Sequence, residues 1–313
     1  MMAILLTGTV FGECLKIKMP PKPSHCGISG GSSQIAKGLD NYMSRQNGYC
    51  KPVMNSRVTR IAQLDATEDT PDQVAVTFVN SSTQRTSTRT YNHVITTTTL
   101  PCLRVVNLDD AGLNFPQKAA LRTLQYGPAV KVGVKFKTTW WEDPGVWKKY
   151  APSGFGPIIG GQSYTDKMAR TVVYPSYGND PEPRSTVLIV SYARSMDAIA
   201  LGALCGPDRE SSAQLKRRML EDLVSVHKFN AEGAAFLEEQ WVDAYPHAWQ
   251  NDPNTMGACD VIECSIALLT VFLTGAFGFF GPGQFMFLYR YLTSPAASGR
   301  LHFAGEGVSV RHG

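Results

Sequence analysis

The segment Arg300–Gly307, near the end of the chain, restricts the possible folds more than any other feature. It reads Arg-Leu-His-Phe-Ala-Gly-Glu-Gly, an apolar strand that runs into glycines with one acidic residue, Glu306, between them. In α/β sheets, ligands bind beyond the carboxyl ends of the strands, so a carboxylate at this place is compatible with a ligand site. Taken alone, however, a Gly-Glu-Gly loop is more typical of a plain turn.

Composition indicates a globular chain and excludes several partners. The 313 residues are 43% hydrophobic and 18% charged, which is enough apolar material for a large core in one or two domains. The net charge of +4 is spread through the sequence, without the basic and aromatic interleaving of a nucleic-acid groove. The seven cysteines form no CxxC pair and have no histidine at ligand spacing, so neither a metal site nor a disulfide framework is predicted.

The first third of the chain predicts one helix followed by strands. A glycine-rich turn, Gly27–Ser33, precedes apolar residues at helical spacing, Ile35, Leu39 and Met43, with a serine available as N-cap. Segments rich in β-branched residues then predict strands at Val58–Ile61, Val74–Val79 and Thr86–Tyr91, the last leading into Val94–Ile95, with Ser81–Gln84 closing a hairpin.

The middle of the chain predicts two strands, a long loop and a helix. Val130–Phe136 alternates apolar with polar or small residues, so one face of this strand carries lysines away from the core. Val187–Tyr192 is a second strand, and Pro144–Gly161, rich in proline and glycine, is the expected long loop. The S-x-x-Q capping box Ser211–Gln214 predicts a helix over 211–228. Three tryptophans are expected to pack at the end of the first strand: Trp140, Trp141 and Trp147.

Four segments, in the same order, resemble the flavin-dependent amine oxidases. Leu301–Glu306 matches the "hFAGE" signature of that family, and Gly281–Phe285 resembles the loop that precedes it. Gly30–Ala36 resembles the family's "GG-s-x-x-l-a" turn, and Asn55–Ile61 resembles its "n-x-x-V-x-x-I" strand. The resemblance runs from about residue 25 to residue 313. Within the family, the chain is most similar to the L-amino-acid oxidases.

The resemblance implies a mixed α/β (α+β) fold. It consists of an incomplete FAD-binding Rossmann-like domain and a mixed-sheet substrate domain, without the N-terminal βαβ unit, because no G-x-G-x-x-G turn occurs in the chain. The implied division is an atypical leader at 1–24, part of the FAD-binding domain at 25–126, the substrate-binding domain at 127–245, and the C-terminal part of the FAD-binding domain at 246–313.

The resemblance also assigns residues to the cofactor. Gly30 and Gly31 form the family's cofactor-binding turn, and Val58 offers its backbone to the adenine. Gly305 and Glu306 lie at the phosphate and ribitol portion of the flavin.

Two further residues are assigned to the reaction. Lys131 falls where the family keeps a lysine that holds a water at the flavin N5, and a cation there assists the reaction with oxygen. Tyr192 matches the tyrosine that hydrogen-bonds the substrate carboxylate in amino-acid oxidases. From the residues alone, Lys131 also reads as a solvated lysine on a strand edge and Tyr192 as a core tyrosine.

The implied activity is the oxidative deamination of L-amino acids. The amine or amino acid is oxidised with FAD and O2 to an imine, which hydrolyses to a keto acid and ammonia, with hydrogen peroxide as the second product. This chain is expected to be an inactive fragment of such an enzyme, and a non-catalytic binding module on the same scaffold is the alternative. A membrane protein is disfavoured, because glycines and Pro282 interrupt the uncharged run Cys264–Tyr289. The apolar start, Met1–Gly12, lacks the flanks of a signal peptide, so the compartment is undetermined between cytoplasmic and secreted.

An insertion is suspected at 258–274. The Gly-Ala pair at Gly257–Ala258 is repeated at Gly275–Ala276, where the family pattern resumes. This repeat favours a retained intron translated in frame, and a genuine inserted strand or helix is the alternative.

Overall fold

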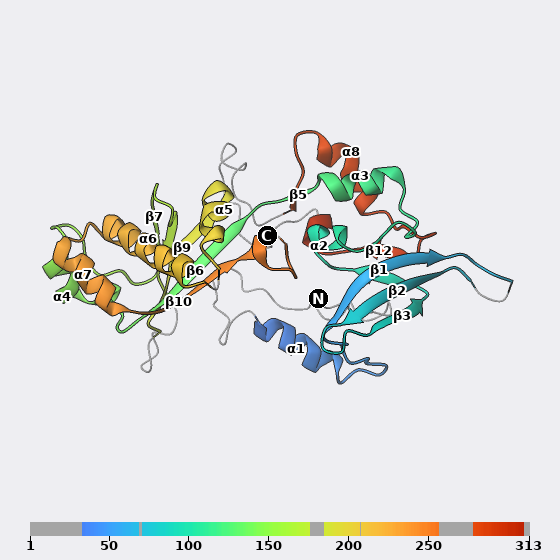
Figure 1. The fold of residues 1–313 in the computed structure, drawn as a ribbon, viewed down its shortest axis with the longest axis horizontal. Coiled ribbons are helices and arrows are strands. Elements are labelled where there is room, and N and C mark those ends of the chain that lie inside the picture. The colour runs from blue at the N-terminus through green and yellow to red at the C-terminus, as the bar shows by residue number, and fades with distance from the viewer. Residues whose placement is uncertain (1–32, 69–70, 176–184, 207, 257–277, 310–313) are drawn as a thin grey trace, which may run out of the picture. The chain divides into compact units, whose positions relative to one another are not determined.

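The computed structural model describes residues 33–68, 71–175, 185–206, 208–256 and 278–309. The chain divides into two compact units (Figure 1). Unit 1 comprises Met1–Thr98, Leu103–Ala120 and Met286–Val308, and unit 2 comprises Thr99–Cys102, Leu121–Phe285 and Ser309–Gly313. The domain boundaries expected from the sequence stay a prediction. So does the insertion at 258–274, which lies outside the described residues.

Unit 1 contains a three-stranded antiparallel sheet and a parallel pair of strands. The sheet consists of β1 (Ser56–Leu64), β2 (Gln73–Asn80) and β3 (Thr86–Tyr91) in that order, so the predicted strands and hairpin are confirmed. β4 (Val94–Thr96) pairs in parallel with β12 (Leu301–Phe303), which brings together segments from opposite ends of the sequence. The unit therefore places the carboxyl ends of β4 and β12 side by side.

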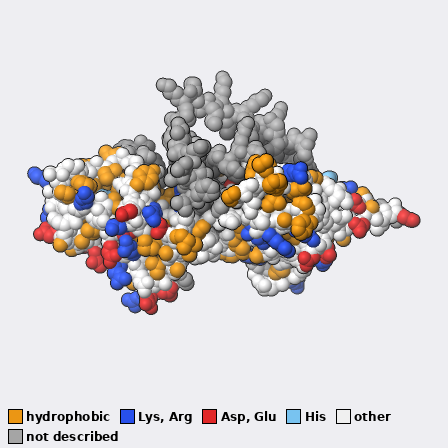
Figure 2. Space-filling model, turned by 90° about the horizontal axis from the view of Figure 1, so that it is seen from above, with side chains coloured by type: hydrophobic (Ala, Val, Ile, Leu, Met, Phe, Trp, Pro, Cys, Tyr) orange, Lys and Arg blue, Asp and Glu red, His pale blue; other side chains and the backbone are white. Residues whose placement is uncertain are grey.

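The helices of unit 1 leave apolar side chains in solvent. The predicted helix is present as α1 (Ser33–Met43), but none of its residues is buried, and Ile35 and Leu39 are 53% and 54% exposed. Hydrophobic side chains also gather around α3 and α8 in Figure 2, and Met286 of α8 is 78% exposed. The 3-10 turn η4 (Glu306–Val308) also belongs to unit 1, and three helices have residues in both units: α2 (Leu100–Arg104), α3 (Phe115–Thr123) and α8 (Gln284–Leu292).

Unit 2 is built on a five-stranded antiparallel sheet in the order β10-β6-β9-β8-β7. In β6, Val130, Val132 and Val134 are fully buried, whereas Lys131 and Lys135 lie on the other face, as the alternation predicts. The strands are β6 (Ala129–Phe136), β7 (Gln162–Tyr164), β8 (Thr171–Val173), β9 (Val187–Arg194) and β10 (Trp241–Ala248), and a short pair joins β5 (Gln125–Tyr126) to β11 (Gly278–Phe279).

Aromatic and aliphatic side chains fill the core of unit 2 on the buried face of this sheet. Trp140, Trp141 and Trp147 are at most 2% exposed, so the predicted packing of the tryptophans is confirmed. They belong to one cluster with Met219 and Leu223 of the long helix. The helices of the unit are α4 (Pro144–Tyr150), α5 (Ser195–Ala203), α6 (Arg209–His227) and α7 (Ala231–Gln240), with 3-10 turns η1 (Trp140–Glu142) and η2 (Trp249–Asn251).

Two local predictions are corrected. The helix expected over 211–228 is α6, but it begins at Arg209, because the Asp208 carboxylate accepts the Ser211 N–H and caps the helix in place of Ser211. The expected long loop 144–161 begins with helix α4. Asp143 accepts the Gly145 N–H and Pro144 stands in the first turn, where a missing N–H costs nothing.

A buried polar network ties α6 to the sheet. The Nε2 atom of His227 lies 2.7 Å from the Tyr174 hydroxyl, and its Nδ1 lies 2.7 Å from the Leu223 carbonyl, to which it donates. Burial lowers the pKa of His227 to about 4 and raises the pKa of Tyr174 to about 12. The imidazole is therefore neutral at neutral pH and accepts a hydrogen bond from the phenol. Within the described residues, every helix is too short or too polar to cross a bilayer.

Candidate functional site

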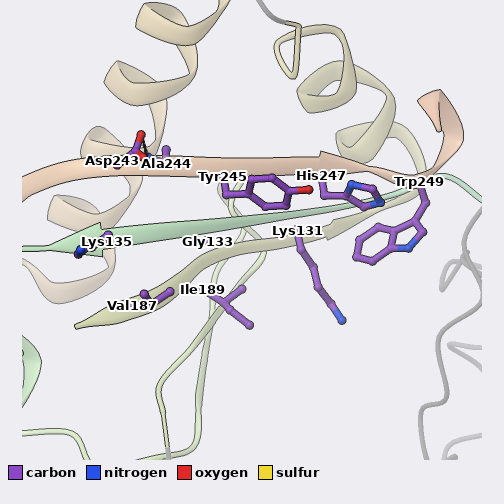
Figure 3. Close-up of a pocket in the computed structure, with 10 residues that line it drawn as sticks. All are labelled: Lys131, Gly133, Lys135, Val187, Ile189, Asp243, Ala244, Tyr245, His247 and Trp249. Carbon is purple, nitrogen blue, oxygen red and sulfur yellow. Dashed lines mark hydrogen bonds between the residues drawn. The ribbon is translucent and has the colours of Figure 1, made fainter. Parts of the chain in front are cut away.

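The open face of the sheet in unit 2 carries a concavity of about 540 Å³. Gly133 lies on this face between Lys131 and Lys135, and its missing side chain leaves room in the floor. Figure 3 shows Lys131 and Trp249 projecting on the same side at one end of the concavity, away from Lys135 and Asp243. The other lining residues are Val187, Ile189, Ala244, Tyr245 and His247.

The structure brings Lys131 and Tyr192 together. Lys131 of β6 is paired with Tyr192 of β9 on one side and with His247 of β10 on the other, so the three side chains share a face. The Lys131 ammonium lies 4.5 Å from the centroid of the Tyr192 ring and 5.3 Å from that of Trp249. Both distances fit cation–π contacts, which hold the ammonium beside apolar ring faces.

Aromatic residues that the sequence analysis did not single out form one wall of this site. Tyr245, His247 and Trp249 alternate along β10 into η2, so they project from the same face. The rings of His247 and Trp249 meet edge to face at a centroid separation of 4.6 Å. The period-two spacing of three rings was the available signal in the sequence.

Arg194 is a second residue that the sequence analysis missed. It ends β9, two residues after Tyr192, and its guanidinium carbon lies 4.4 Å from the centroid of the Tyr192 ring. No carboxylate within the described ranges forms an ion pair with it. Tyr192 is therefore contacted by two cations, Lys131 and Arg194. Such a site attracts anionic groups such as carboxylates.

The cofactor residues assigned to unit 1 occupy two places. Gly305 follows the carboxyl end of β12 with φ at +111°, a conformation that glycine adopts far more readily than other residues. A Cβ at Gly305 would lie 3.5 Å from the Thr97 carbonyl oxygen, which follows β4, and Glu306 comes next in η4. Val58 lies half-buried on β1, opposite Phe78, in the antiparallel sheet. Gly30 and Gly31 lie outside the described residues.

Comparison with known proteins establishes the family. Residues 19–313 match the sequence profile of the flavin containing amine oxidoreductases, so the chain belongs to this family. It is 38% identical over 289 residues to L-amino-acid oxidase 4 of Hebeloma cylindrosporum, covering 91% of this chain and 40% of that protein. It is 36% identical over 256 residues to a putative bifunctional amine oxidase of Dictyostelium discoideum, covering 82% of this chain and 21% of that protein. The chain thus spans less than half the length of these relatives.

The fold agrees with this membership. A solved structure of putrescine oxidase, from a redesign of its cofactor binding, matches 90% of this chain and 48% of that one, with a TM-score of 0.58 at 15% identity. This likeness confirms the mixed helix-and-sheet fold class expected from the sequence.

The family implies a flavin cofactor, and the described residues fit one. The turn after β12 presents backbone at Gly305, next to the Thr97 carbonyl, and it lies at the carboxyl edge of the β4–β12 pair, where α/β sheets bind ligands. In unit 2, the Lys131 ammonium provides a positive charge beside ring faces, and such a charge favours electron-rich species.

Proposed function

We propose that this chain is part of an FAD-dependent L-amino-acid oxidase. The observation that carries the proposal is the Lys131–Tyr192 pair. These two predicted site residues are paired on neighbouring strands, and the Lys131 ammonium contacts the Tyr192 ring. The relative that is 38% identical over 91% of the chain is an L-amino-acid oxidase, which supports amino acids as the substrates.

In the complete enzyme, a bound FAD supplies the hydride acceptor for oxidation of the α-amino group and passes the electrons to O2. Gly30, Gly31 and the Val58 backbone would hold the nucleotide portion, and Gly305 and Glu306 would contact its phosphate and ribitol. This assignment places the cofactor contacts in unit 1.

The chain's own side chains in unit 2 bind and polarise the reactants. The Tyr192 hydroxyl donates a hydrogen bond to the substrate carboxylate and thereby orients the α-carbon. The Lys131 ammonium lies beside the Tyr192 and Trp249 rings, where it orders a water molecule and stabilises negative charge as O2 is reduced. The rings of Tyr245, His247 and Trp249 form an aromatic wall on one side of the site.

We further propose that these 313 residues alone are catalytically inactive. They contain no G-x-G-x-x-G turn to bind a pyrophosphate at a helix N-terminus. A non-catalytic binding module on the same scaffold is the second candidate, and it predicts that the chain holds flavin without turnover.

Two preparations test these proposals. The first joins the chain to a dinucleotide-binding βαβ segment and omits 258–274. It should release hydrogen peroxide with L-amino acids and much less with simple amines that lack a carboxylate. Turnover of amines but not of amino acids would refute the substrate class.

The second preparation is the chain alone. It should be colourless after purification, and added FAD should not restore peroxide release. One flavin per chain without activity would favour the binding module, and one flavin with activity would refute the inactive fragment.

A further inference from the structure

Two histidines from distant parts of the sequence meet in unit 1. His93 directly precedes β4, and His302 lies in the middle of β12, the parallel partner of β4. Their rings face each other at a centroid separation of 5.5 Å and an interplanar angle of 32°. The Nδ1 atom of His93 lies 3.3 Å from the Nε2 atom of His302.

This nitrogen separation matches a pair of metal ligands. Zinc binds histidine nitrogens at about 2.0–2.1 Å with tetrahedral angles, which places two ligand nitrogens about 3.3–3.4 Å apart. A direct hydrogen bond between ring nitrogens would be expected nearer to about 3.0 Å. The observed 3.3 Å between His93 and His302 matches the ligand spacing and also fits a long direct hydrogen bond, and the experiment below separates the two.

The surroundings of His302 favour the neutral, metal-binding form of its ring. The Gly299 backbone accepts a hydrogen bond from the ring, and Nε2 is the nitrogen that faces His93, so Nδ1 is the nitrogen left to donate. Ligating histidines commonly donate their second N–H to a backbone carbonyl, which orients the ring and fixes its tautomer. The lone pair of His302 is thus directed towards His93.

The site is open to solvent and has no third protein ligand in the part of the chain that the structure describes. His93 is exposed and His302 is half-buried, so an ion can enter and water can fill the remaining coordination positions. Imidazole ligands suit Zn²⁺, Cu²⁺ and Ni²⁺ rather than Mg²⁺ or Ca²⁺.

We propose that His93 and His302 form a two-histidine site for a late first-row divalent cation that links β4 to β12. The ion would bind only when the two strands are paired, so it would stabilise unit 1 by mass action. His302 lies on β12, which leads into the turn at Gly305 and Glu306. The ion would therefore stabilise the strand pair that carries this turn.

The test uses the chain without an affinity tag, with His25→Gln and His312→Gln as a common background that removes histidines outside the described residues. Titration with ZnCl2, followed by calorimetry, should show one site. His93→Gln and His302→Gln should each weaken zinc binding by about tenfold or more, because either change leaves a single imidazole. His93 is exposed, so His93→Gln keeps the experiment meaningful even if His302→Gln fails to fold.

Two further measurements exclude a purely structural effect of the substitutions. Zinc should raise the melting temperature of the background chain but not that of either variant. Electron paramagnetic resonance of the Cu²⁺-loaded chain should show coupling to two imidazole nitrogens, and to one in each variant. Absence of zinc binding up to millimolar concentration, or equal affinity in the background and in His93→Gln, would overturn the proposal and leave a hydrogen-bonded pair. Neither outcome depends on oxidase activity.

Discussion

The two units of this chain differ in how they treat their apolar side chains. In unit 2, the tryptophans Trp140 and Trp141 are fully buried in one cluster with residues of helix α6, and the open sheet face carries lysines, aromatic rings and a few aliphatic side chains. In unit 1, helix α1 buries no side chain, and Met286 of α8 remains 78% exposed. A helix with an apolar stripe is stabilised by packing of that stripe. The apolar stripe of α6 is packed within unit 2, whereas that of α1 in unit 1 is exposed.

This contrast separates stability from cofactor binding. Unit 2 has a large buried core and holds Lys131 and Tyr192 on paired strands of a five-stranded sheet. In unit 1, the glycine turn at Gly305 follows a short parallel strand pair, in which each strand contributes only three paired residues. We therefore expect substitutions in unit 2 to change folding or kinetics, and substitutions in unit 1 to change cofactor retention.

Truncation of the buried tryptophan should have the largest effect. Trp140→Ala removes a fully buried side chain and should lower the free energy of unfolding of unit 2 by about 3–5 kcal/mol. Leu39→Ala on α1, where the side chain is 54% exposed, should change the free energy of unfolding of unit 1 by about 0.5 kcal/mol or less. Urea unfolding followed by circular dichroism measures both. Equal losses in the two variants would contradict the difference between the units.

Acid should destabilise unit 2 through His227. Its pKa is about 4 in the folded state against an ordinary value of 6.5. Between these two pH values, His227 binds a proton in the unfolded chain but stays neutral in the folded chain. The free energy of unfolding should fall by about 3 kcal/mol between these two pH values, with the stabilisation fully present above pH 6.5. Stability curves against pH measure this, and His227→Gln should flatten them in that window. An unchanged slope in His227→Gln would assign the acid sensitivity to other groups.

Loss of the site lysine should affect one half-reaction. In the complete flavoprotein, Lys131→Met should slow reoxidation by O2 by about 100-fold, because a charge that stabilises developing negative charge is removed. Reduction by substrate and flavin content should change little. Stopped-flow absorbance separates the two steps. Lys135→Met, on the same strand and face but at the other end of the concavity, is the matched control and should reoxidise normally. Normal reoxidation in Lys131→Met would remove Lys131 from the site.

Loss of the tyrosine hydroxyl should have the smallest effect. Tyr192→Phe should raise the KM for amino acids by about tenfold in the complete flavoprotein, the value of one hydrogen bond to a charged group, with kcat little changed. Steady-state peroxide assays measure both constants. Glu306→Gln in unit 1 should instead lower the fraction of chains that carry flavin. A KM that is unaffected in Tyr192→Phe would leave carboxylate recognition to Arg194.

Part of the local structure of the chain could be predicted from its sequence. The strands of unit 1, β6, β9 and helix α6 follow from β-branched segments, period-two alternation and helical spacing, because these patterns reflect short-range sterics and the sidedness of each element. The Leu301–Glu306 motif and the family it indicates were likewise readable, since the signature is contiguous in the chain. Helix α4 was not predicted, because the proline and glycine in its first turn indicated a loop. The side chain of Asp143 caps the N-terminus of this helix and stabilises it.

Contacts between distant residues were decided only by the tertiary structure. Strand pairing places Lys131, Tyr192 and His247 on one face, and the parallel pairing of β4 with β12 brings His93 within 3.3 Å of His302 across 209 residues. The sequence specifies which side of a strand each residue occupies, but register and partner strand depend on which pairing buries the most apolar surface without leaving backbone groups unpaired. That choice is a property of the whole chain, so Arg194, the histidine pair and the contact of Trp249 with Lys131 could be recognised only after it was made.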